Sequence, residues 1–207
     1  MFDVVVPDPT NPAVKYGISC KMRRELNRAS SGDGRITMEL SNSAKQFWQH
    51  LHRKGIMEAN YRNTPVEVGE GLIELVRTWH ETESHTAGGI IDLSKSYYLV
   101  LSWNKKREYQ LHQFPLELPQ HLNWYFPTKK TKQGEQPADR LCGADETGVV
   151  FEWYGTSGGQ LKYYPLAKTA IWTSDVFRLE PLPSSEEVEY GIVAKAKTYF
   201  PIKWSKL

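Results

Sequence analysis

Residues 1–26 read MFDVVVPDPTNPAVKYGISCKMRREL. Two β-prone runs, 2–6 and 16–23, flank a loop rich in Pro, Asp and Asn, the residue types that supply turn geometry. The pattern predicts an antiparallel hairpin with a long loop centred near Asn11. Paired residue numbers would then sum to about 22, which places Asp3 opposite Ser19. Side chains two apart share a face, so we expect Asp3, Ser19 and Lys21 to converge.

A carboxylate, a hydroxyl and a lysine in one place suit phosphodiester hydrolysis. A hard cation held by oxygen ligands polarises the phosphate and acidifies a water molecule, and a lysine stabilises the developing negative charge. Mg²⁺ takes only one or two protein carboxylates. Asp8, in the loop, is a weaker candidate than Asp3. The plain alternative is that Asp3 is a turn or solvent residue and the Ser-x-Lys triplet a chance one.

Helical periodicity follows the hairpin. Apolar side chains at i, i+3, i+4 and i+7 predict helices over 43–55 and 69–83, the first with Ser43 and Gln46 as a capping box and Gly55 at its end. Beyond residue 90 the pattern is β. Extended segments are predicted at 36–40, 96–103, 108–116, 148–166 and 170–183, and exposed loops at 28–35 and 128–139. No element is assigned to the tail from residue 184.

This order predicts an α/β fold, with a mixed β-sheet flanked by helices and then a β-rich C-terminal portion. We place the first portion at 1–118 and the second, a candidate target-recognition region, at 119–207.

The strings FDVVV and GISCK resemble the core hairpin of the PD-(D/E)xK nuclease superfamily, especially type II restriction endonucleases. The run GISCKMRREL…GRITMELSNSAKQFW is similar to such enzymes too, since their catalytic strand leads into a helix packed on the sheet. The likeness extends over residues 2–115. It implies a restriction-endonuclease-like sheet, Mg²⁺-dependent cleavage of double-stranded DNA, Asp3 as the metal-binding aspartate and Lys21 as the catalytic lysine. It also implies a homodimer acting on two-fold symmetric sites.

The chain departs from this pattern at two points. Ser19 stands where the family usually has an acid, and some restriction endonucleases with Ser there recruit a carboxylate from a following element. Glu39 is our candidate for that acid and Glu25 the runner-up, so Asp3 and Glu39 are predicted to hold the metal. They can share a cation if both carboxylates lie within ~5 Å of one common point, and if they diverge the catalytic hypothesis loses its relocated acid. Such cores also place a helix and a strand before the Asp strand, so we expect this chain to lack them and to be poorly active alone.

Two groups of polar residues are candidates for DNA contact: Arg23, Arg24 and Arg28, and Gln160 and Lys162. The arginines directly follow the catalytic strand and could grip phosphates. Gly158 and Gly159 would let the backbone approach the duplex, with Gln160 and Lys162 contacting base edges or backbone. The alternative is a set of solvated cations and an ordinary hairpin turn.

The amino-acid composition limits the kinds of partner and cofactor that the protein can bind. A net charge of +2, from 26 Lys+Arg and 24 Asp+Glu, excludes a highly basic tail binder but permits a local basic cleft. Cys20 and Cys142 do not suggest a disulfide framework, and Cys20 should point into the core, away from Lys21. The six histidines show no zinc-ligand pattern, and the phosphate-binding G-x-x-x-x-G-K-[ST] loop is absent, so no small-molecule cofactor is expected.

No signal peptide or membrane-spanning run is seen, which predicts a soluble cytoplasmic protein. Two other functions stay open. One is a catalytically silent DNA-binding protein on the same scaffold. The other is a β-rich interaction module without a nucleic-acid role, which would be favoured if Lys21, Arg23 and Lys162 were scattered over separate faces.

Overall fold

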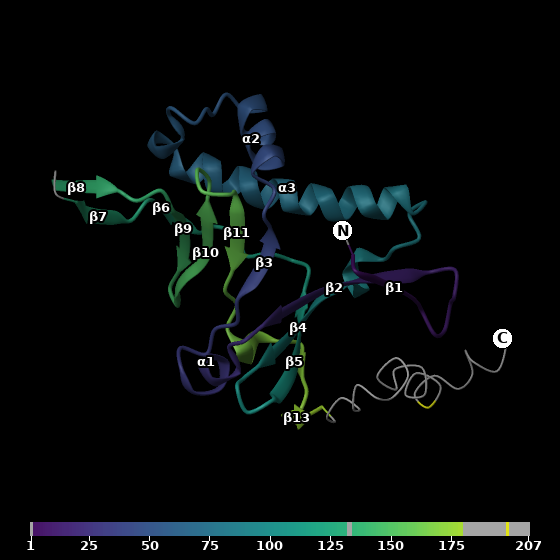
Figure 1. The fold of residues 1–207 in the computed structure, drawn as a ribbon. Coiled ribbons are helices and arrows are strands. Elements are labelled where there is room, and N and C mark those ends of the chain that lie inside the picture. Colours follow the sequence, from purple (N-terminus) through teal and green to yellow (C-terminus); the bar gives the residue numbers. More distant parts are fainter. Residues whose placement is uncertain (1, 132–133, 180–197, 199–207) are drawn as a thin grey trace, which may run out of the picture. The chain divides into compact units, whose positions relative to one another are not determined.

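The computed structural model describes residues 2–131, 134–179 and 198 (Figure 1). Residues 1–177 form one compact unit and residues 178–207 a second, and the fold given below is that of the first. The tail from residue 184 lies outside the described residues except for residue 198, and so do residues 180–183 of the last predicted extended segment.

The predicted hairpin opens the first sheet. β1 (Val4–Pro7) pairs antiparallel with β2 (Lys15–Arg23), and Val4 lies opposite Ile18, as the predicted register requires. β2 runs parallel to β4 (Tyr97–Trp103), and β4 antiparallel to β5 (Glu108–Pro115). The short strands β12 (Trp172–Thr173) and β13 (Phe177–Arg178) both pair with β5. The sheet is therefore mixed, as predicted.

A second sheet has five antiparallel strands. Their order is β3 (Met38–Ser41), β11 (Gln160–Tyr163), β10 (Gly148–Tyr154), β9 (Leu141–Asp145) and β6 (Asn123–Tyr125). β3 comes from the N-terminal portion and the other four from the C-terminal portion, so the two predicted portions share this sheet. The boundary predicted after residue 118 falls in the connection between β5 and β6.

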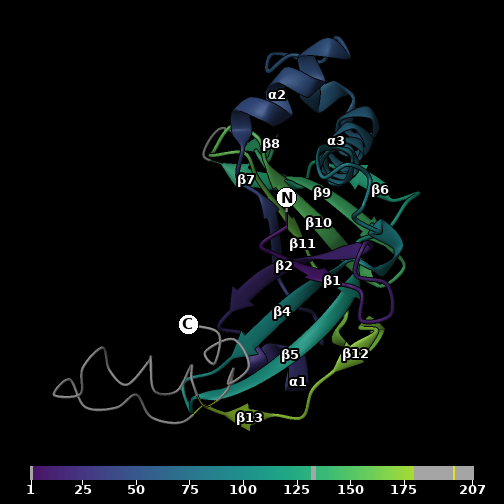
Figure 2. The same cartoon turned by 90° about the vertical axis from the view of Figure 1, so that its right-hand side faces the viewer.

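Three helices lie between β2 and β4 in sequence: α1 (Leu26–Ser31), α2 (Ala44–Arg53) and α3 (Pro65–Thr86). Single 3-10 turns occur at Tyr61–Asn63, Leu93–Lys95 and Ala167–Thr169. Figures 1 and 2 show α2 and α3 together above the second sheet. No helix in the described part of the chain is both long enough and apolar enough to cross a membrane.

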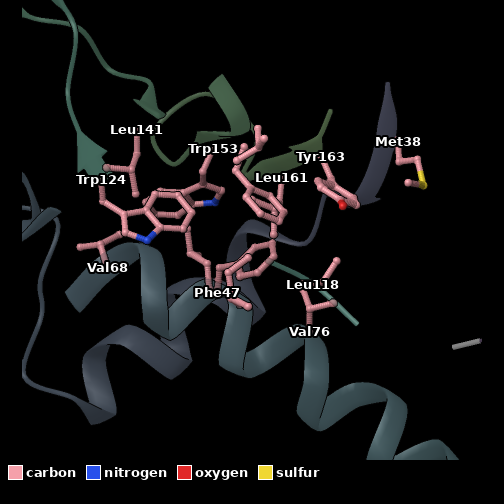
Figure 3. Close-up of a cluster of buried hydrophobic side chains, with 14 of the residues drawn as sticks. Met38, Phe47, Val68, Val76, Leu118, Trp124, Leu141, Trp153, Leu161 and Tyr163 are labelled. Carbon is pink, nitrogen blue, oxygen red and sulfur yellow. The ribbon is translucent and has the colours of Figure 1, made fainter. Parts of the chain in front are cut away.

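The core lies between α2, α3 and the second sheet, and it continues to Tyr98, Val100 and Phe114 of the first sheet. In Figure 3, Phe47 and Val68 face Trp124, Trp153 and Leu161. Complete burial of side chains of this size contributes about 1.5–3 kcal/mol each. Packing is tight enough to require glycine, because a Cβ at Gly69 of α3 would lie 2.0 Å from the Trp124 ring. The amphipathic stripes seen in the sequence are therefore what attaches the helices to the sheet.

Several local predictions need correction. Ser43 is the N-cap residue of α2, but its side chain makes no capping hydrogen bond, so the capping box is wrong. α3 starts four residues earlier than predicted, at Pro65, because proline fits the first turn of a helix. The predicted loop at 28–35 begins with the last residues of α1. The predicted loop at 128–139 contains a two-stranded ribbon, β7 (Thr128–Thr131) and β8 (Gly134–Pro137).

Cys20 lies on the predicted side of β2 but is exposed, so its assignment to the core is wrong. The neighbouring strand agrees, because Leu99 and Leu101 of β4, which lie level with Cys20 and Met22 in the pairing, are only partly buried. Met22, two residues along the same face, is 64 % exposed. The alternation of side chains along β2 correctly places Cys20 on the face opposite Lys21, but that face is not the interior of the described unit.

Candidate active site

The carboxylate of Asp3 extends the ladder between the first two strands. The Asp3 backbone N–H donates to the Ile18 carbonyl at 2.9 Å. Its Oδ2 accepts the backbone N–H of Cys20 at 2.7 Å and, at a long 3.4 Å, the Ser19 hydroxyl. Asp3 is thus held beside Ser19, as predicted, while its Oδ1 accepts no hydrogen bond from the described residues.

The residue before Asp3 anchors this end of the hairpin. The Phe2 ring stacks on His80 of α3, with ring centroids 5.6 Å apart. It also covers Gly17, where a Cβ would lie 2.2 Å from the ring. Burial, together with the nearby positive charge of Lys21, lowers the pKa of His80 to about 4. A neutral imidazole therefore packs behind the candidate site at neutral pH.

Lys21 lies on the part of β2 that extends beyond its pairing with β1. The backbone pairing with β1 ends before Cys20, and the strand continues to Arg23 with β4 alongside. Lys21 is partly buried and makes no ion pair or hydrogen bond with any described residue. It lines an open pocket between β2 and β3 together with Arg23, Glu39 and Asn42. Its ammonium group is available to an incoming anion.

Glu39 enters the same pocket from the second sheet. Its Oε2 accepts hydrogen bonds from Arg23 Nη2 and from Gln160 Nε2, each at 2.6 Å. Lys162 lies directly opposite Glu39 in the β3–β11 pairing, but its ammonium sits 4.8 Å from the centre of the Tyr154 ring. Residues predicted for metal binding and for DNA contact therefore meet where the two sheets come together.

The competing acids have other partners. The two oxygens of Glu25 accept the backbone N–H and the hydroxyl of Thr37, at 2.5 and 2.7 Å. Asp8, in the hairpin loop, pairs with Lys95 at 2.8 Å, and this ammonium holds the pKa of the Asp8 carboxyl well below its usual range. Both acids stabilise local structure. Glu39 has partners too, and what sets it apart is that it lines the same pocket as Lys21.

The structure separates the three arginines that follow β2. Arg23 faces the pocket, whereas the guanidinium of Arg24 lies 5.9 Å from the centre of the Trp103 ring. Arg28 pairs with Asp33 at 2.8 Å, and this carboxylate raises the pKa of Arg28. Only the first of them shares a pocket with Lys21.

The donor atoms suit a hard cation, but the two carboxylates are held apart. The Asp3 carboxylate is bound by the backbone amide of Cys20, and the Glu39 carboxylate by the side chain of Arg23. These two positions on β2 are three residues apart (23 − 20 = 3), which corresponds to ~10 Å along the strand. Lys21 lies between these points. The structure therefore does not bring the two predicted ligands to one point. Each carboxylate keeps one oxygen without a hydrogen bond from the described residues, but a shared Mg²⁺ would require Glu39 to leave Arg23 and move toward Asp3.

No group of three or more His, Cys, Asp or Glu side chains placed to hold a metal occurs among the described residues.

The glycines before Gln160 serve the fold. A Cβ at Gly159, whose φ is +67°, would lie 2.2 Å from the Ala44 Cα, so the close backbone approach is to the start of α2. Sequence reasoning missed Phe2 and His80 as supports of Asp3. The one signal for His80 was its position four residues after Val76, on the apolar stripe of α3.

Comparisons with known proteins add no identification. No family model, no curated protein and no solved structure matches this chain.

Proposed function

We propose that this protein is a Mg²⁺-dependent, sequence-specific endonuclease that hydrolyses phosphodiester bonds of double-stranded DNA, like type II restriction enzymes. One observation carries the proposal. The Asp3 carboxylate accepts a hydrogen bond from the backbone amide of Cys20, the residue before Lys21 on β2. At this point β2 extends beyond its pairing with β1. An acid, and a lysine that pairs with none of the described residues, thus lie at the open end of a hairpin.

The topology supports the same proposal. The Asp3 strand is antiparallel to the Lys21 strand, and the chain then passes through helices before it returns as β4, parallel to β2. The connection also contains β3 of the second sheet, and the return through helices resembles a restriction-endonuclease-like core, in which the catalytic strand leads into a helix packed on the sheet. That specific core is part of the proposal.

Each site residue has a role in this scheme. When bound, Mg²⁺ polarises the phosphate and lowers the pKa of a coordinated water. Asp3 would hold it through the oxygen that accepts no hydrogen bond from the described residues, and Glu39 would join only after leaving Arg23 and moving toward Asp3. The Lys21 ammonium assists the attacking water and stabilises negative charge that develops on the phosphate. Ser19 steadies the Asp3 carboxylate and offers its hydroxyl to the attacking water.

The DNA would lie across the meeting point of the two sheets. Lys21 and Arg23 share one pocket, and Gln160 and Lys162 adjoin it through Glu39. This clustering speaks against an interaction module with scattered cations. Arg24 and Arg28 would contact phosphates further from the site. A homodimer would present two such sites to a two-fold symmetric sequence.

The test is cleavage of plasmid and unmethylated genomic DNA with Mg²⁺ by wild type, Lys21→Ala and Lys15→Ala. Lys15 is a matched control because it lies on the same strand, at the end away from the pocket. We expect discrete fragments from wild type and Lys15→Ala, and a rate about 100- to 1000-fold lower for Lys21→Ala.

Other results would select another function. Salt-sensitive DNA binding without cleavage would identify a catalytically silent DNA-binding protein, a possibility raised by the pairing of Glu39 with Arg23. If Lys21→Ala cleaved and bound DNA as well as wild type does, Lys21 would have no role in the mechanism. Absence of both activities in wild type would refute the nucleic-acid proposal.

A further inference from the structure

A row of polar side chains crosses the second sheet on the face away from its core. Trp153 and Leu161 point toward α2 and α3 (Figure 3). Because side chains alternate along a strand, their neighbours Glu152 and Lys162 project from the opposite face. These two residues are paired between β10 and β11, and Lys162 lies level with Glu39 of β3 as well. The row therefore begins beside the candidate site and continues across the sheet.

Glu152 organises the middle of this row. Its side chain is only 13 % exposed, and its Oε1 pairs with Nη1 of Arg140 at 2.8 Å. Its Oε2 accepts the hydroxyls of Tyr154 and Tyr164, at 2.8 and 2.6 Å. Burial, together with the Glu152 carboxylate, raises the pKa of both phenols, so both keep the protons that they donate at neutral pH. One acid thereby fixes an arginine and two tyrosines.

Tyr154 in turn supports Lys162. The Lys162 ammonium lies 4.8 Å from the centre of the Tyr154 ring, within the range of a cation–π contact. In the sheet pairing Lys162 stands between Glu39 and Glu152, but within the described chain it forms no ion pair with either acid. Its charge is therefore held over the sheet without being neutralised there.

We propose that Arg140 and Lys162 contact phosphates of the DNA duplex and extend the DNA-binding surface from the candidate site across the second sheet. Glu152, Tyr154 and Tyr164 hold these two cations on that face. This inference rests on the proposed function. It adds Arg140, which sequence reasoning did not single out, and the direction in which the duplex lies.

Arg140 can bind a phosphate without leaving Glu152. A guanidinium carries five N–H donors, and the ion pair uses Nη1. The Arg140 side chain is 41 % exposed, so other donors can reach an incoming strand. Phosphate oxygens accept such donors in short, charge-assisted hydrogen bonds. The pair with Glu152 thus orients the arginine and does not have to break.

The spacing of the cations suits a DNA backbone. The strand order β3–β11–β10–β9 places β9 three strands from β3, or ~14 Å across the sheet. A duplex of that length contains about four base pairs at about 3.4 Å each. The pocket of Lys21 and Arg23 lies at one end of this span, and Arg140, directly before β9, at the other. Lys162 lies between them on β11.

Lys54 provides a matched control for Arg140. It is the C-cap residue of α2, across the core from the row, and its side chain is 38 % exposed. Like Arg140 it pairs with one carboxylate, that of Glu74 at 2.6 Å. Lys54→Gln and Arg140→Gln thus each remove one positive charge and one ion pair, but on opposite sides of the second sheet.

The experiment measures binding of a labelled mixed-sequence duplex by fluorescence anisotropy, without divalent ions and over a range of salt concentrations. Each phosphate contact contributes about −0.9 to the slope of log affinity against log salt concentration. We expect Arg140→Gln and Lys162→Gln each to reduce the slope by about that amount and to weaken binding about five- to tenfold at low salt. The double variant should lose about twice as much slope, and Lys54→Gln should change neither quantity.

Two further measurements separate contact from folding. Arg140→Lys keeps the charge and should keep the slope of wild type. Thermal unfolding of each variant checks the fold. If Arg140→Gln is unstable, Lys162→Gln still decides the question, because it removes a charge that forms no ion pair with a described residue.

An unchanged slope in folded Arg140→Gln, an unchanged slope in Lys162→Gln, or an equal loss in Lys54→Gln would each overturn the inference. Any of these results beside Lys21-dependent cleavage by wild type would leave the proposed function standing. The expected slopes without cleavage would support this surface on the catalytically silent alternative. Absence of salt-sensitive binding by wild type would refute both the inference and the proposed function.

Discussion

Asp3 and Cys20 are joined by a 2.7 Å hydrogen bond from the backbone amide to the carboxylate, and this bond gives the aspartate a structural duty beside its proposed chemical one. The same oxygen faces the Ser19 hydroxyl, while the other accepts no hydrogen bond from the part of the chain that the structure describes and could bind a cation. Because the two duties use different oxygens, substitutions can separate them.

Asp3→Asn keeps an acceptor for the Cys20 amide but loses the charge, whereas Asp3→Ala loses both. We expect both variants to lose Mg²⁺-dependent cleavage. Asp3→Ala should also lower the free energy of unfolding by about 1 kcal/mol, and Asp3→Asn by less than about 0.5 kcal/mol. Urea unfolding and the cleavage assay give the two quantities. Full cleavage by Asp3→Asn would exclude Asp3 as a metal ligand.

Glu39 and Glu25 should respond in opposite ways to replacement by glutamine. Glu39→Gln removes a partly exposed ion pair, so we expect loss of cleavage with a change in unfolding free energy below about 1 kcal/mol. Glu25→Gln weakens the hydrogen bonds with Thr37 and should lower the free energy of unfolding by about 1–2 kcal/mol, while cleavage persists. Cleavage by Glu39→Gln and not by Glu25→Gln would reverse the assignment of the relocated acid.

His80 makes stability depend on pH. Above about pH 6.5 its ring is neutral in both folded and unfolded chains, so it contributes no pH dependence. Between about pH 6.5 and 4 the unfolded chain binds a proton and the folded chain does not, so the free energy of unfolding falls as pH falls. The depressed pKa, from 6.5 to about 4, corresponds to a loss of roughly 3 kcal/mol.

Unfolding of wild type and His80→Phe, measured at several pH values, tests this. The phenyl ring can keep the stack on Phe2, and the fall in stability should be smaller in the variant by most of that amount. An NMR titration of the His80 ring protons should show a midpoint near 4. A midpoint near 6.5 would contradict the buried position of the ring.

Two glycines of α3 make a paired test of packing. Helix propensity alone predicts that alanine stabilises either position by about 1 kcal/mol. At Gly69 the new Cβ would lie 2.0 Å from the Trp124 ring, so we expect a loss of about 1–3 kcal/mol. At Gly71 the nearest atom is the end of the Leu51 side chain at 3.2 Å, which can shift, so Gly71→Ala should change stability by less than about 1 kcal/mol. Thermal unfolding of both variants measures the difference, and equal effects would refute this packing.

The parts of the fold that were predicted correctly depend on local rules. The turn residues around Asn11 fix the hairpin register, so Val4 pairs with Ile18 and Asp3 reaches Ser19. The two-residue period of a strand likewise puts Lys21 on the face of Ser19. These relations need no knowledge of the rest of the chain.

The parts that were missed depend on contacts between distant segments. Glu39 is bound by Gln160, 121 positions away, and no local pattern encodes that pairing. Arg23 and Arg24 are neighbours in sequence, yet one enters a pocket and the other covers Trp103, because the strand ends between them. Whether the face of Cys20 is covered depends on which helices pack there, which alternation cannot specify.

The candidate site is assembled from two sheets: Asp3, Ser19 and Lys21 belong to one, and Glu39 and Gln160 to the other. β2 and β3 are not paired by backbone hydrogen bonds, so side-chain contacts alone hold the two halves of the site together there, and local opening at this place would separate them before global unfolding. Activity is therefore expected to fade on heating some degrees below the melting temperature. A DNA duplex bound to both sheets, as proposed, would restrain this opening and should raise the temperature at which activity is lost.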